Sequence, residues 1–275
     1  MGQRQREQVQ RGCAVGTVVL LAWLCRVLPL EGLPSGLQEA CGILRSLLYL
    51  SLFAGWGISL YNRTVHPQVR RLLLNVDLLM LFWIIVRTLR FQLNTPPGMD
   101  RMLGYLYYAP MLGIPVLCVQ LVLTVDRSER YRLSAWARML WLPSAVLLEL
   151  VLTNDLHQQV FAFSGGVPGG QDNSSFSHRP LYFACLVWMV ACMFFSLVRL
   201  LNKSRIPGSG KKNLAPFVTG CITVLYGFLY LSGLPAVRWW FGDMNVMFCL
   251  LYAAIYELAN DTCLWTLGVY QMKSI

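Results

Sequence analysis

"LMLFWIIVRTLRFQL", residues 79–93, decides the class of protein, because it is apolar enough to lie in lipid and yet carries Arg87 and Arg90. Each arginine costs about 2.5–3.5 kcal/mol at the centre of a bilayer on insertion scales. A chain tolerates such residues where they lie near a membrane surface or face polar groups inside a helix bundle. The role of the two arginines therefore depends on how the chain crosses the membrane.

The composition of the whole chain is that of a membrane protein. Of its 275 residues, 56% are hydrophobic and only 13% are charged, whereas roughly a quarter of the residues in soluble domains are charged. Apolar stretches of about 17–25 residues are long enough to cross a bilayer as helices. Seven occur, at about 43–61, 71–92, 102–125, 136–153, 180–201, 214–234 and 244–267. The sequence predicts an all-α integral membrane protein, with a seven-transmembrane helix bundle at 40–270 and a short cytoplasmic tail at 271–275.

The net charge of +10 reflects membrane topology. If the segments alternate in direction, the loops 62–71, 126–138 and 199–212 share one side. These loops hold twelve basic residues: Arg63, Arg70, Arg71, Arg127, Arg130, Arg132, Arg138, Arg199, Lys203, Arg205, Lys211 and Lys212. The opposite loops hold three, Arg101, Arg179 and Arg238. Basic loops face the cytoplasm, so we expect a multi-pass protein of the cell (plasma) membrane. The first of the seven helices starts outside, the C-terminus is cytoplasmic, and no nucleic-acid partner is expected.

Residues 1–39 are predicted to form an N-terminal signal or signal-anchor segment and a linker. Arg4, Arg6 and Arg11 precede an apolar run from Ala14 to Cys25, which is the pattern of a secretory signal. A clean cleavage site is missing from the sequence. The segment is therefore either removed or retained as an additional helix, and both alternatives give the seven following helices the same topology.

Polar residues gather near the predicted outer ends of several segments. Arg87 and Arg90 lie on one helical face with Trp83, and "TNDLH" (153–157) ends the fourth segment. We expect the arginines to face Glu149, Asp155 and Asp243 across an outward cavity for a small ligand. Its lining would comprise Arg87, Arg90, Glu149, Asn154, Asp155, His157, Trp240 and Asp243. Two alternatives stay open: the arginines extend to lipid phosphates, or the charged residues form an ion-pair network that only holds the helices in position.

A second polar set lies deeper in the predicted membrane. Asp77 is about two turns from the inner end of the second segment, and Glu257 and Asp261 lie towards the inner end of the seventh. We interpret these three residues as coupling groups between the outer cavity and the cytoplasmic face. A carboxyl group in such surroundings tends to stay protonated, so two alternatives stay open: proton carriers, or neutral hydrogen-bonding struts.

Two further patterns concern packing and the outer surface. Ser51, Gly55 and Ser59 are four residues apart, and such a stripe of small residues predicts the close approach of a neighbouring helix. In the long outer loop, "VFAF" (160–163) and "SFS" (175–177) flank a segment rich in glycine. These flanks predict a small hairpin over the outer mouth of the bundle.

Enzyme motifs do not occur in the sequence. There is no H-E-x-x-H, no G-x-S-x-G and no phosphate-binding glycine loop, and His66, His157 and His178 lie in loops on two different sides. The nine cysteines are almost all in apolar segments, with no C-x-x-C, and resemble small buried hydrophobic residues. We therefore predict a protein that is not an enzyme and that has no catalytic residue, no metal site and no cofactor.

Several blocks of the chain resemble a known family. They are "ILRSLLYLSLFAGWGISL" (43–60), "QVRRLLL" (68–74), "FWIIVRTLRF" (82–91), "YLYYAPMLGIPVL" (105–117), "VLTNDLHQQVF" (151–161) and "GDMNVMFCLLYAAIYE" (242–257). Together they resemble the bacterial N-terminal seven-transmembrane region of membrane histidine kinases, in a stand-alone form without the kinase domain. The resemblance implies a sensory input module with an extracytoplasmic N-terminus, and it gives weight to Arg87, to "TNDLH" and to Glu257.

The sequence differs from the kinase-bearing members where they would signal, because it stops at Ile275 without their dimerisation helices and ATP-binding domain. The prediction is a receptor-like sensor in the lipid bilayer that binds an unknown small ligand and contacts a cytoplasmic kinase or regulator through the loops 126–138 and 199–212. Two other functions stay open. The chain could be a small-solute or proton-coupled transporter, although it shows no internal repeat, or a non-catalytic assembly subunit of a larger membrane complex.

Overall fold

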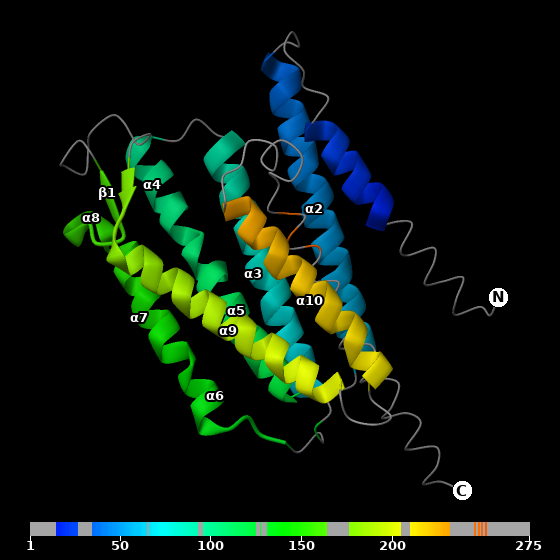
Figure 1. Cartoon of the computed structure of the whole chain (residues 1–275). Helices are drawn as coiled ribbons and strands as arrows, with labels where there is room; N and C mark the ends of the chain where they lie inside the picture. Colours follow the sequence, from blue (N-terminus) through cyan, green and yellow to red (C-terminus); the bar gives the residue numbers. More distant parts are fainter. Residues whose placement is uncertain are drawn as a thin grey trace, which may run out of the picture.

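Long helices run side by side from one end of the molecule to the other (Figure 1). The computed structural model describes residues 15–26, 35–64, 66–92, 96–124, 127, 131–163, 176–204 and 210–231, together with 245, 247, 249 and 251. The first helix is Val15–Arg26. It is followed by α2 (Ser35–Arg63), α3 (Pro67–Gln92), α4 (Pro97–Leu106), α5 (Tyr108–Thr124), α6 (Ala135–Met139), α7 (Trp141–Leu152), α8 (Asn154–His157), β1 (Phe161–Phe163), β2 (Phe176–His178), α9 (Pro180–Ser204) and α10 (Gly210–Leu231).

Within the described residues, five helical segments are long and apolar enough to cross a membrane. They are Gly36–Asn62, Pro67–Gln92, Gly98–Thr124, Ala135–Leu152 and Pro180–Asn202. Two shorter apolar helices are Val15–Arg26 and Phe217–Gly227. The predicted all-α membrane fold is therefore confirmed.

Two of these segments are interrupted, and a proline explains each break. Proline has no N–H to donate to the carbonyl group four residues earlier. Pro110 thus leaves the carbonyl of Leu106 without its helical partner, and α4 ends at Leu106. In the same way Pro143 cannot pair with Met139, where α6 ends. Each helix resumes one residue later, as α5 and α7 respectively.

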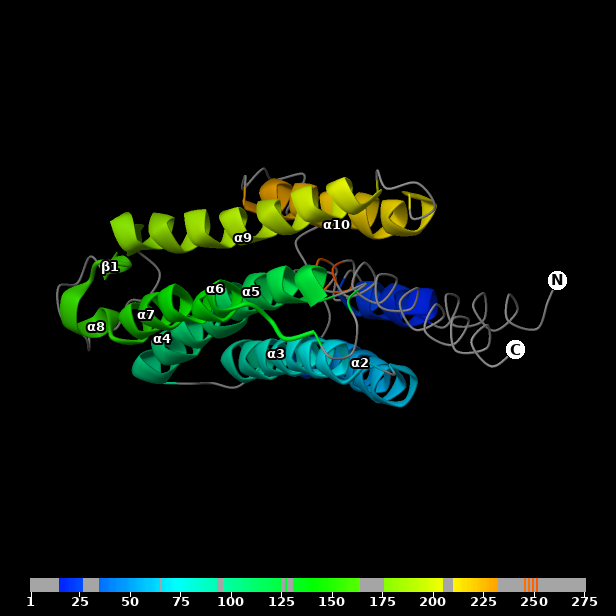
Figure 2. The same ribbon diagram turned by 90° about the horizontal axis from the view of Figure 1, so that it is seen from below.

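The helices are arranged in three layers, which are clearest in the view from below (Figure 2). One outer layer contains α2 and α3, the other contains α9 and α10, and α4–α7 lie between them. The central helix is α5: 78% of the residues in an apolar 18-residue stretch of its segment are buried, against 17% in the corresponding stretch of Pro180–Asn202. The exposed apolar side chains of the outer layers, such as Phe194 and Val187 on α9, are those that lipid would cover.

The helices α2 and α3 form the largest part of the core. Tyr49 and Phe53 from α2 pack with Val76 and Met80 from α3 and with Leu117 from α5, and all five are almost completely buried. The first helix joins this cluster through Ala22, which is fully buried. Leu200 from α9 also belongs to this cluster. Residues from all three layers thus share one apolar core.

At Gly57 the backbone of α2 packs against a side chain of α3. A Cβ atom on Gly57 would overlap the carboxylate of Asp77, so the backbone of α2 lies directly against this side chain. The small-residue stripe was expected to allow the close approach of a neighbouring helix, but within the described residues no atom lies within 4 Å of a Cβ atom on Gly55. Gly57 shares a helical face with the large buried side chains of α2 that contact α3, whereas Ser51 and Gly55 are exposed.

The predicted hairpin is confirmed. Strands β1 and β2 are antiparallel, with Phe161 opposite His178 and Phe163 opposite Phe176. It lies at the same end of the bundle as the start of α4 and the end of α7 (Figure 1). The helices α2, α5 and α9 end at the opposite end of the bundle, and in the sequence each is followed by one of the basic loops.

Candidate functional site

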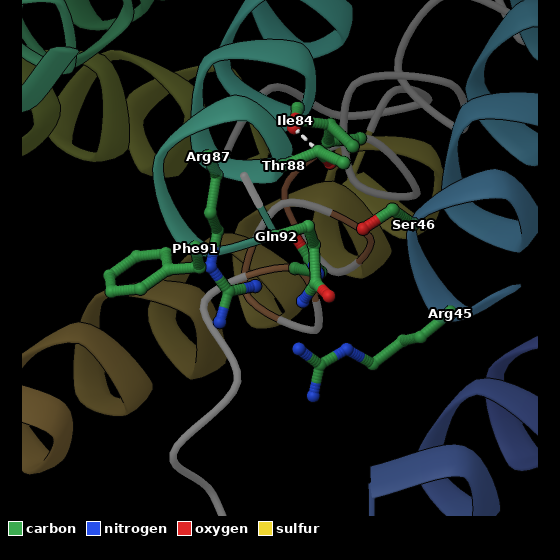
Figure 3. Close-up of a pocket in the computed structure, with 8 residues that line it drawn as sticks. Arg45, Ser46, Ile84, Arg87, Thr88, Phe91 and Gln92 are labelled. Carbon is green, nitrogen blue, oxygen red and sulfur yellow. Dashed lines mark hydrogen bonds between the residues drawn. The ribbon is translucent and has the colours of Figure 1, made fainter. Parts of the chain in front are cut away.

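Arg87 lines a cavity of about 210 Å³ at the hairpin end of the bundle. The lining comes from α2, α3 and the helical residue at position 245: Arg45, Ser46, Ile84, Arg87, Thr88, Phe91, Gln92 and Asn245. Figure 3 shows the guanidinium groups of Arg45 and Arg87 and the carboxamide of Gln92 directed into the same space. The cavity therefore contains two positive charges and several hydrogen-bond donors.

The position of Arg87 follows from its own helix. Its guanidinium carbon lies 5.4 Å from the ring centroid of Trp83 and 6.0 Å from that of Phe91, one turn before and one turn after it on α3. Aromatic faces attract a guanidinium group through cation–π interactions. The hydroxyl groups beside it donate to backbone carbonyls of their own helices: Thr88 to Ile84 at 2.7 Å and Ser46 to Gly42 at 3.2 Å.

Arg90 has a different environment from Arg87. It forms a two-pronged ion pair with Asp100, in which Nε donates to Oδ1 at 2.9 Å and an Nη group donates to Oδ2 at 3.2 Å. Asp100 is in the first turn of α4, where a negative charge is also favoured by the helix dipole. Arg90 also lies 5.6 Å from the ring centroid of Tyr107. This arginine joins α3 to α4.

The next residue along α4 makes the second link. Adjacent helical residues point about 100° apart, so Asp100 faces α3 whereas Arg101 faces α8. The Nε atom of Arg101 lies 3.7 Å from Oδ2 of Asp155, and the hydroxyl of Tyr105 donates to Oδ1 of the same carboxylate at 2.6 Å. Arg90 and Asp155 therefore pair with two neighbours on α4, Asp100 and Arg101. For Arg90, this pairing corrects the expectation that the arginines of α3 face Glu149, Asp155 and Asp243, because its carboxylate partner is Asp100.

Asn154 connects α8 to the hairpin. Its side chain is fully buried. Its Oδ1 atom accepts hydrogen bonds from the backbone N–H groups of Val160 and Phe161 at 2.9 and 3.1 Å. Its Nδ2 group donates to the carbonyl of Phe161 at 3.0 Å and to the hydroxyl of Tyr105 at 3.2 Å. Asn154 thus acts as a structural clamp at the start of β1.

Glu149 and His157 do not line the cavity. Glu149 is exposed on α7. His157 bridges two backbone groups: its Nδ1 atom accepts from the N–H of Gln159 at 3.0 Å, and its Nε2 atom lies 2.9 Å from the carbonyl oxygen of Leu150. These contacts assign a neutral imidazole with the proton on Nε2. His157 therefore closes the turn after α8.

The other predicted residues divide into two groups. Asp77 is buried at the contact between α2 and α3, near the middle of the core. Trp240, Asp243, Glu257 and Asp261 lie outside the described residues. Asn245, two residues after Asp243, does line the cavity.

The set predicted from sequence lacks several polar residues of this region, among them Arg45, Asp100, Arg101 and Tyr105. Arg45 lies in an apolar segment, as Arg87 does, and this shared feature was a usable signal. Asp100 is the first acidic residue after Arg90 in the chain and is separated from it by two prolines that favour a turn. Tyr105 gave no such signal, because its partners are about fifty residues away in sequence.

The described residues contain no group of three or more His, Cys, Asp or Glu side chains that could hold a metal ion. The polar groups at this end are instead two guanidinium groups in a cavity and a chain of ion pairs beside it. Such an arrangement can bind an anionic group and can connect the ends of neighbouring helices.

Over residues 44–267 the chain matches the family described as the N-terminal seven-transmembrane region of histidine kinases. No curated protein and no solved structure matches the chain significantly. The family match extends over most of the 275 residues, and it confirms the resemblance that the sequence blocks indicate. The chain therefore belongs to the family of N-terminal seven-transmembrane regions of histidine kinases.

Proposed function

We propose that this protein is a receptor-like membrane sensor module that perceives an extracytoplasmic or membrane-borne stimulus and signals through a separate cytoplasmic kinase or regulator. The observation that carries the proposal is the family match, because the matched region precedes the kinase in histidine kinases. Such a region has to convert a stimulus into a change of helix arrangement. The described end of the bundle has the contacts that such a change requires.

A sensor needs two helix arrangements that a ligand distinguishes by binding one more strongly. At the hairpin end, Arg87 lies in a cavity formed by α2 and α3, while Arg90 links α3 to α4. Asp155 continues the chain of contacts to α8. A ligand that moves α3 relative to α2 would therefore also act on α4 and on the hairpin.

The predicted residues have different places in this proposal. Arg87 contacts the ligand. Arg90, Asn154 and Asp155 hold the neighbouring elements in register, whereas Glu149 and His157 do not line the cavity. Trp240 and Asp243 remain proposed ligand-binding residues, and Asp77, Glu257 and Asp261 remain proposed coupling residues; of these five, only Asp77 is within the described residues. In line with the basic loops, the hairpin end is extracytoplasmic, and the loops 126–138 and 199–212 contact the partner.

The first experiment identifies the output. The chain is cross-linked in native membranes, purified and incubated with radiolabelled ATP. A co-purifying partner should acquire an acid-labile phosphate. Reversing two exposed charges with Arg132→Glu and Arg138→Glu should reduce the recovery of this partner several-fold. The control is Arg179→Glu, an exposed arginine on the opposite side, which should leave recovery unchanged.

Other outcomes would replace the proposal. Solute uptake by proteoliposomes, without any phosphorylated partner, would indicate a transporter. Stoichiometric purification with a larger complex that shows no phosphate transfer would indicate an assembly subunit.

A further inference from the structure

We propose that the hairpin and the first turn of α9 form an aromatic surface that binds the headgroup region of the surrounding membrane. The proposal goes beyond the sensor function and does not depend on it. The surface consists of four rings in mutual contact and is called here the aromatic strip: Phe176, His178, Tyr182 and Phe183. It joins the hairpin to a helix that is long and apolar enough to cross the membrane.

The two faces of the hairpin differ in character. Residues directly opposite each other on antiparallel strands point to the same face, and successive residues of one strand point to opposite faces. The ring-bearing residues of the two strands therefore share one face: Phe161, Phe163, Phe176 and His178. Ala162 and Ser177, which are opposite each other, form the other face. One face is thus aromatic, whereas the other carries only small side chains.

The bundle covers only part of the aromatic face. The ring centroid of Phe161 lies 6.3 Å from that of Tyr105 and 6.0 Å from that of Tyr108, so this ring packs against the central layer. Phe176 contacts the rings of Phe161 and Phe163, but 47% of its surface stays exposed. Burial of such apolar surface is favourable, so a medium less polar than water would stabilise this edge of the hairpin.

The exposed edge continues onto the surface of α9 that lipid covers. The ring centroids of His178 and Tyr182 are 4.0 Å apart, and those of Tyr182 and Phe183 are 5.4 Å apart. Phe183 is 55% exposed and lies in the spanning segment Pro180–Asn202. Val187 and Phe194, which are also exposed, follow it on the same face of the helix because they are four and eleven residues later. The aromatic strip therefore extends the lipid-facing surface of α9 to the hairpin.

The level of the hairpin along the bundle fits the headgroup region. Tyr105 and Tyr108 come seven and ten residues after Gly98, at which the spanning segment of α4 and α5 begins. With a rise of 1.5 Å per residue, the rings that hold Phe161 lie about 10–15 Å along this segment. The hairpin thus packs against the sides of the helix ends, near the first turn of α9 (Figure 1). Aromatic residues are enriched at this level in membrane proteins.

The polar groups of the aromatic strip suit the same location. Histidine and tyrosine each present an apolar body and a polar tip, which favours a boundary between water and lipid. Arg179 lies between His178 and the start of α9 and is exposed. A long basic side chain at such a position can extend to lipid phosphates. The aromatic strip and its neighbour therefore combine the two residue types that anchor proteins at a membrane surface.

Spin labels measure which medium covers each face of the hairpin. Phe176→Cys and Ser177→Cys are prepared in a variant without native cysteines, labelled with a nitroxide and reconstituted in vesicles of phosphatidylcholine and phosphatidylglycerol. Oxygen concentrates in lipid and a nickel chelate stays in water, so power saturation reports contact with each. The ratio of oxygen to chelate collisions should be several-fold higher at position 176 than at position 177, and Phe183→Cys gives the lipid reference.

Two results of this measurement overturn the proposal. Equal ratios at positions 176 and 177 would show that the aromatic face has no preference for lipid. Protection of position 176 from both reagents would show that protein covers it, either a second copy of this chain or another part of the same chain.

Photochemical labelling tests the wild-type chain directly. In vesicles that contain a phospholipid with a photoreactive headgroup, irradiation should attach lipid to the peptide with residues 176–183, which mass spectrometry locates. The double variant Phe176→Ser and Phe183→Ser should reduce this adduct several-fold, because it removes apolar contact area. Phe194→Ser is the matched control, since it removes an exposed ring from the same face of α9 at a greater depth, and should leave the adduct unchanged.

The outcome is decisive even if the double variant does not fold. Absence of the adduct in the wild-type chain overturns the proposal, as does an unchanged adduct in a folded double variant. Neither result affects the sensor function, which is tested by transfer of phosphate to a partner.

Discussion

Arg87 and Arg90 are three residues apart on α3, but they have different neighbours. Arg87 lies in a cavity with a second arginine, whereas Arg90 is neutralised by Asp100. A residue held by a two-pronged ion pair is suited to fix the position of a helix. A residue in a cavity is suited to meet a ligand. We therefore propose that Arg90 fixes the position of α3 and that Arg87 contacts the ligand.

The ion pair between Arg90 and Asp100 should contribute a measurable coupling energy. The two side chains are 27% and 24% exposed, so solvent screens part of their attraction and a coupling of about 1 kcal/mol is expected. The measurement is a double-mutant cycle of Arg90→Ala and Asp100→Ala, with unfolding followed in detergent. Additive effects of the two substitutions would show that the pair does not stabilise the fold.

Replacement of Asn154 should have a larger effect. Asn154→Ala leaves two backbone N–H groups and one carbonyl at the start of β1 without the hydrogen bonds that Asn154 makes. The expected loss is about 2–4 kcal/mol, because buried unsatisfied polar groups are costly. Thermal unfolding measures the loss, and Gln159→Ala, a truncation of a nearby exposed side chain, should have almost no effect. Equal stability of both variants would contradict this role of Asn154.

At the scale of elements, α4 is the part that connects the others. The proline-associated break at Tyr107 separates it from α5. Its first turn then presents Asp100 to one neighbour and Arg101 to the other. The hairpin rests on the same helix, since Tyr105 stacks on Phe161 with ring centroids 6.3 Å apart. A short helix thus combines charge pairing with aromatic packing.

The packing of α2 on α3 depends on Gly57. Gly57→Ala would place a methyl group where the carboxylate of Asp77 lies, and such overpacking should destabilise the fold by about 1–3 kcal/mol. Gly55→Ala is the matched control on the same helix. Its methyl group meets no atom of the described residues within 4 Å, so stability should be unchanged or slightly higher. Chemical unfolding in detergent compares them.

A second measurement tests the cause. If the clash with Asp77 is responsible, Gly57→Ala should cost much less in an Asp77→Ala background than in the wild type. An equal cost in both backgrounds would mean that another contact opposes the methyl group.

For the whole molecule, the decisive feature is that α5 lies between two outer layers. Helices on both sides cover it, so its residues from Leu112 to Thr124 are all buried. The outer layers keep apolar faces exposed, as expected for helices that contact lipid. The two ends of the bundle differ in charge, because the basic loops follow the helices at one end. The sides of the bundle carry exposed apolar side chains.

The charge difference between the ends leads to a prediction about orientation. In a variant without native cysteines, Ser174→Cys and Ser209→Cys should react with an impermeant maleimide from opposite sides of the membrane, with position 174 outside. Twelve basic residues against three favour this orientation. Labelling of both positions from the same side would contradict the proposed topology, and with it the external location of the cavity.

The sequence alone determined the class of the protein, five of the apolar segments long enough to span a membrane, and the hairpin; most of the predicted segment 244–267 lies outside the described residues. Each follows from local properties: apolar length predicts a span, and aromatic residues that flank a glycine-rich loop predict paired strands. The two helix breaks are also local in origin. Each proline lacks the N–H group that would donate to the carbonyl four residues earlier. The blocks of charged and aromatic residues were sufficient to indicate the family.

The tertiary structure decided which polar groups meet. It paired Arg90 with Asp100, placed Arg45 beside Arg87, turned Glu149 outwards and selected Gly57 as the contact between α2 and α3. None of these follows from the sequence, because a shift in the rotation of a helix about its axis changes the neighbours of every side chain on it. That rotation is set by packing against several other helices at once, so it is a property of the assembled bundle.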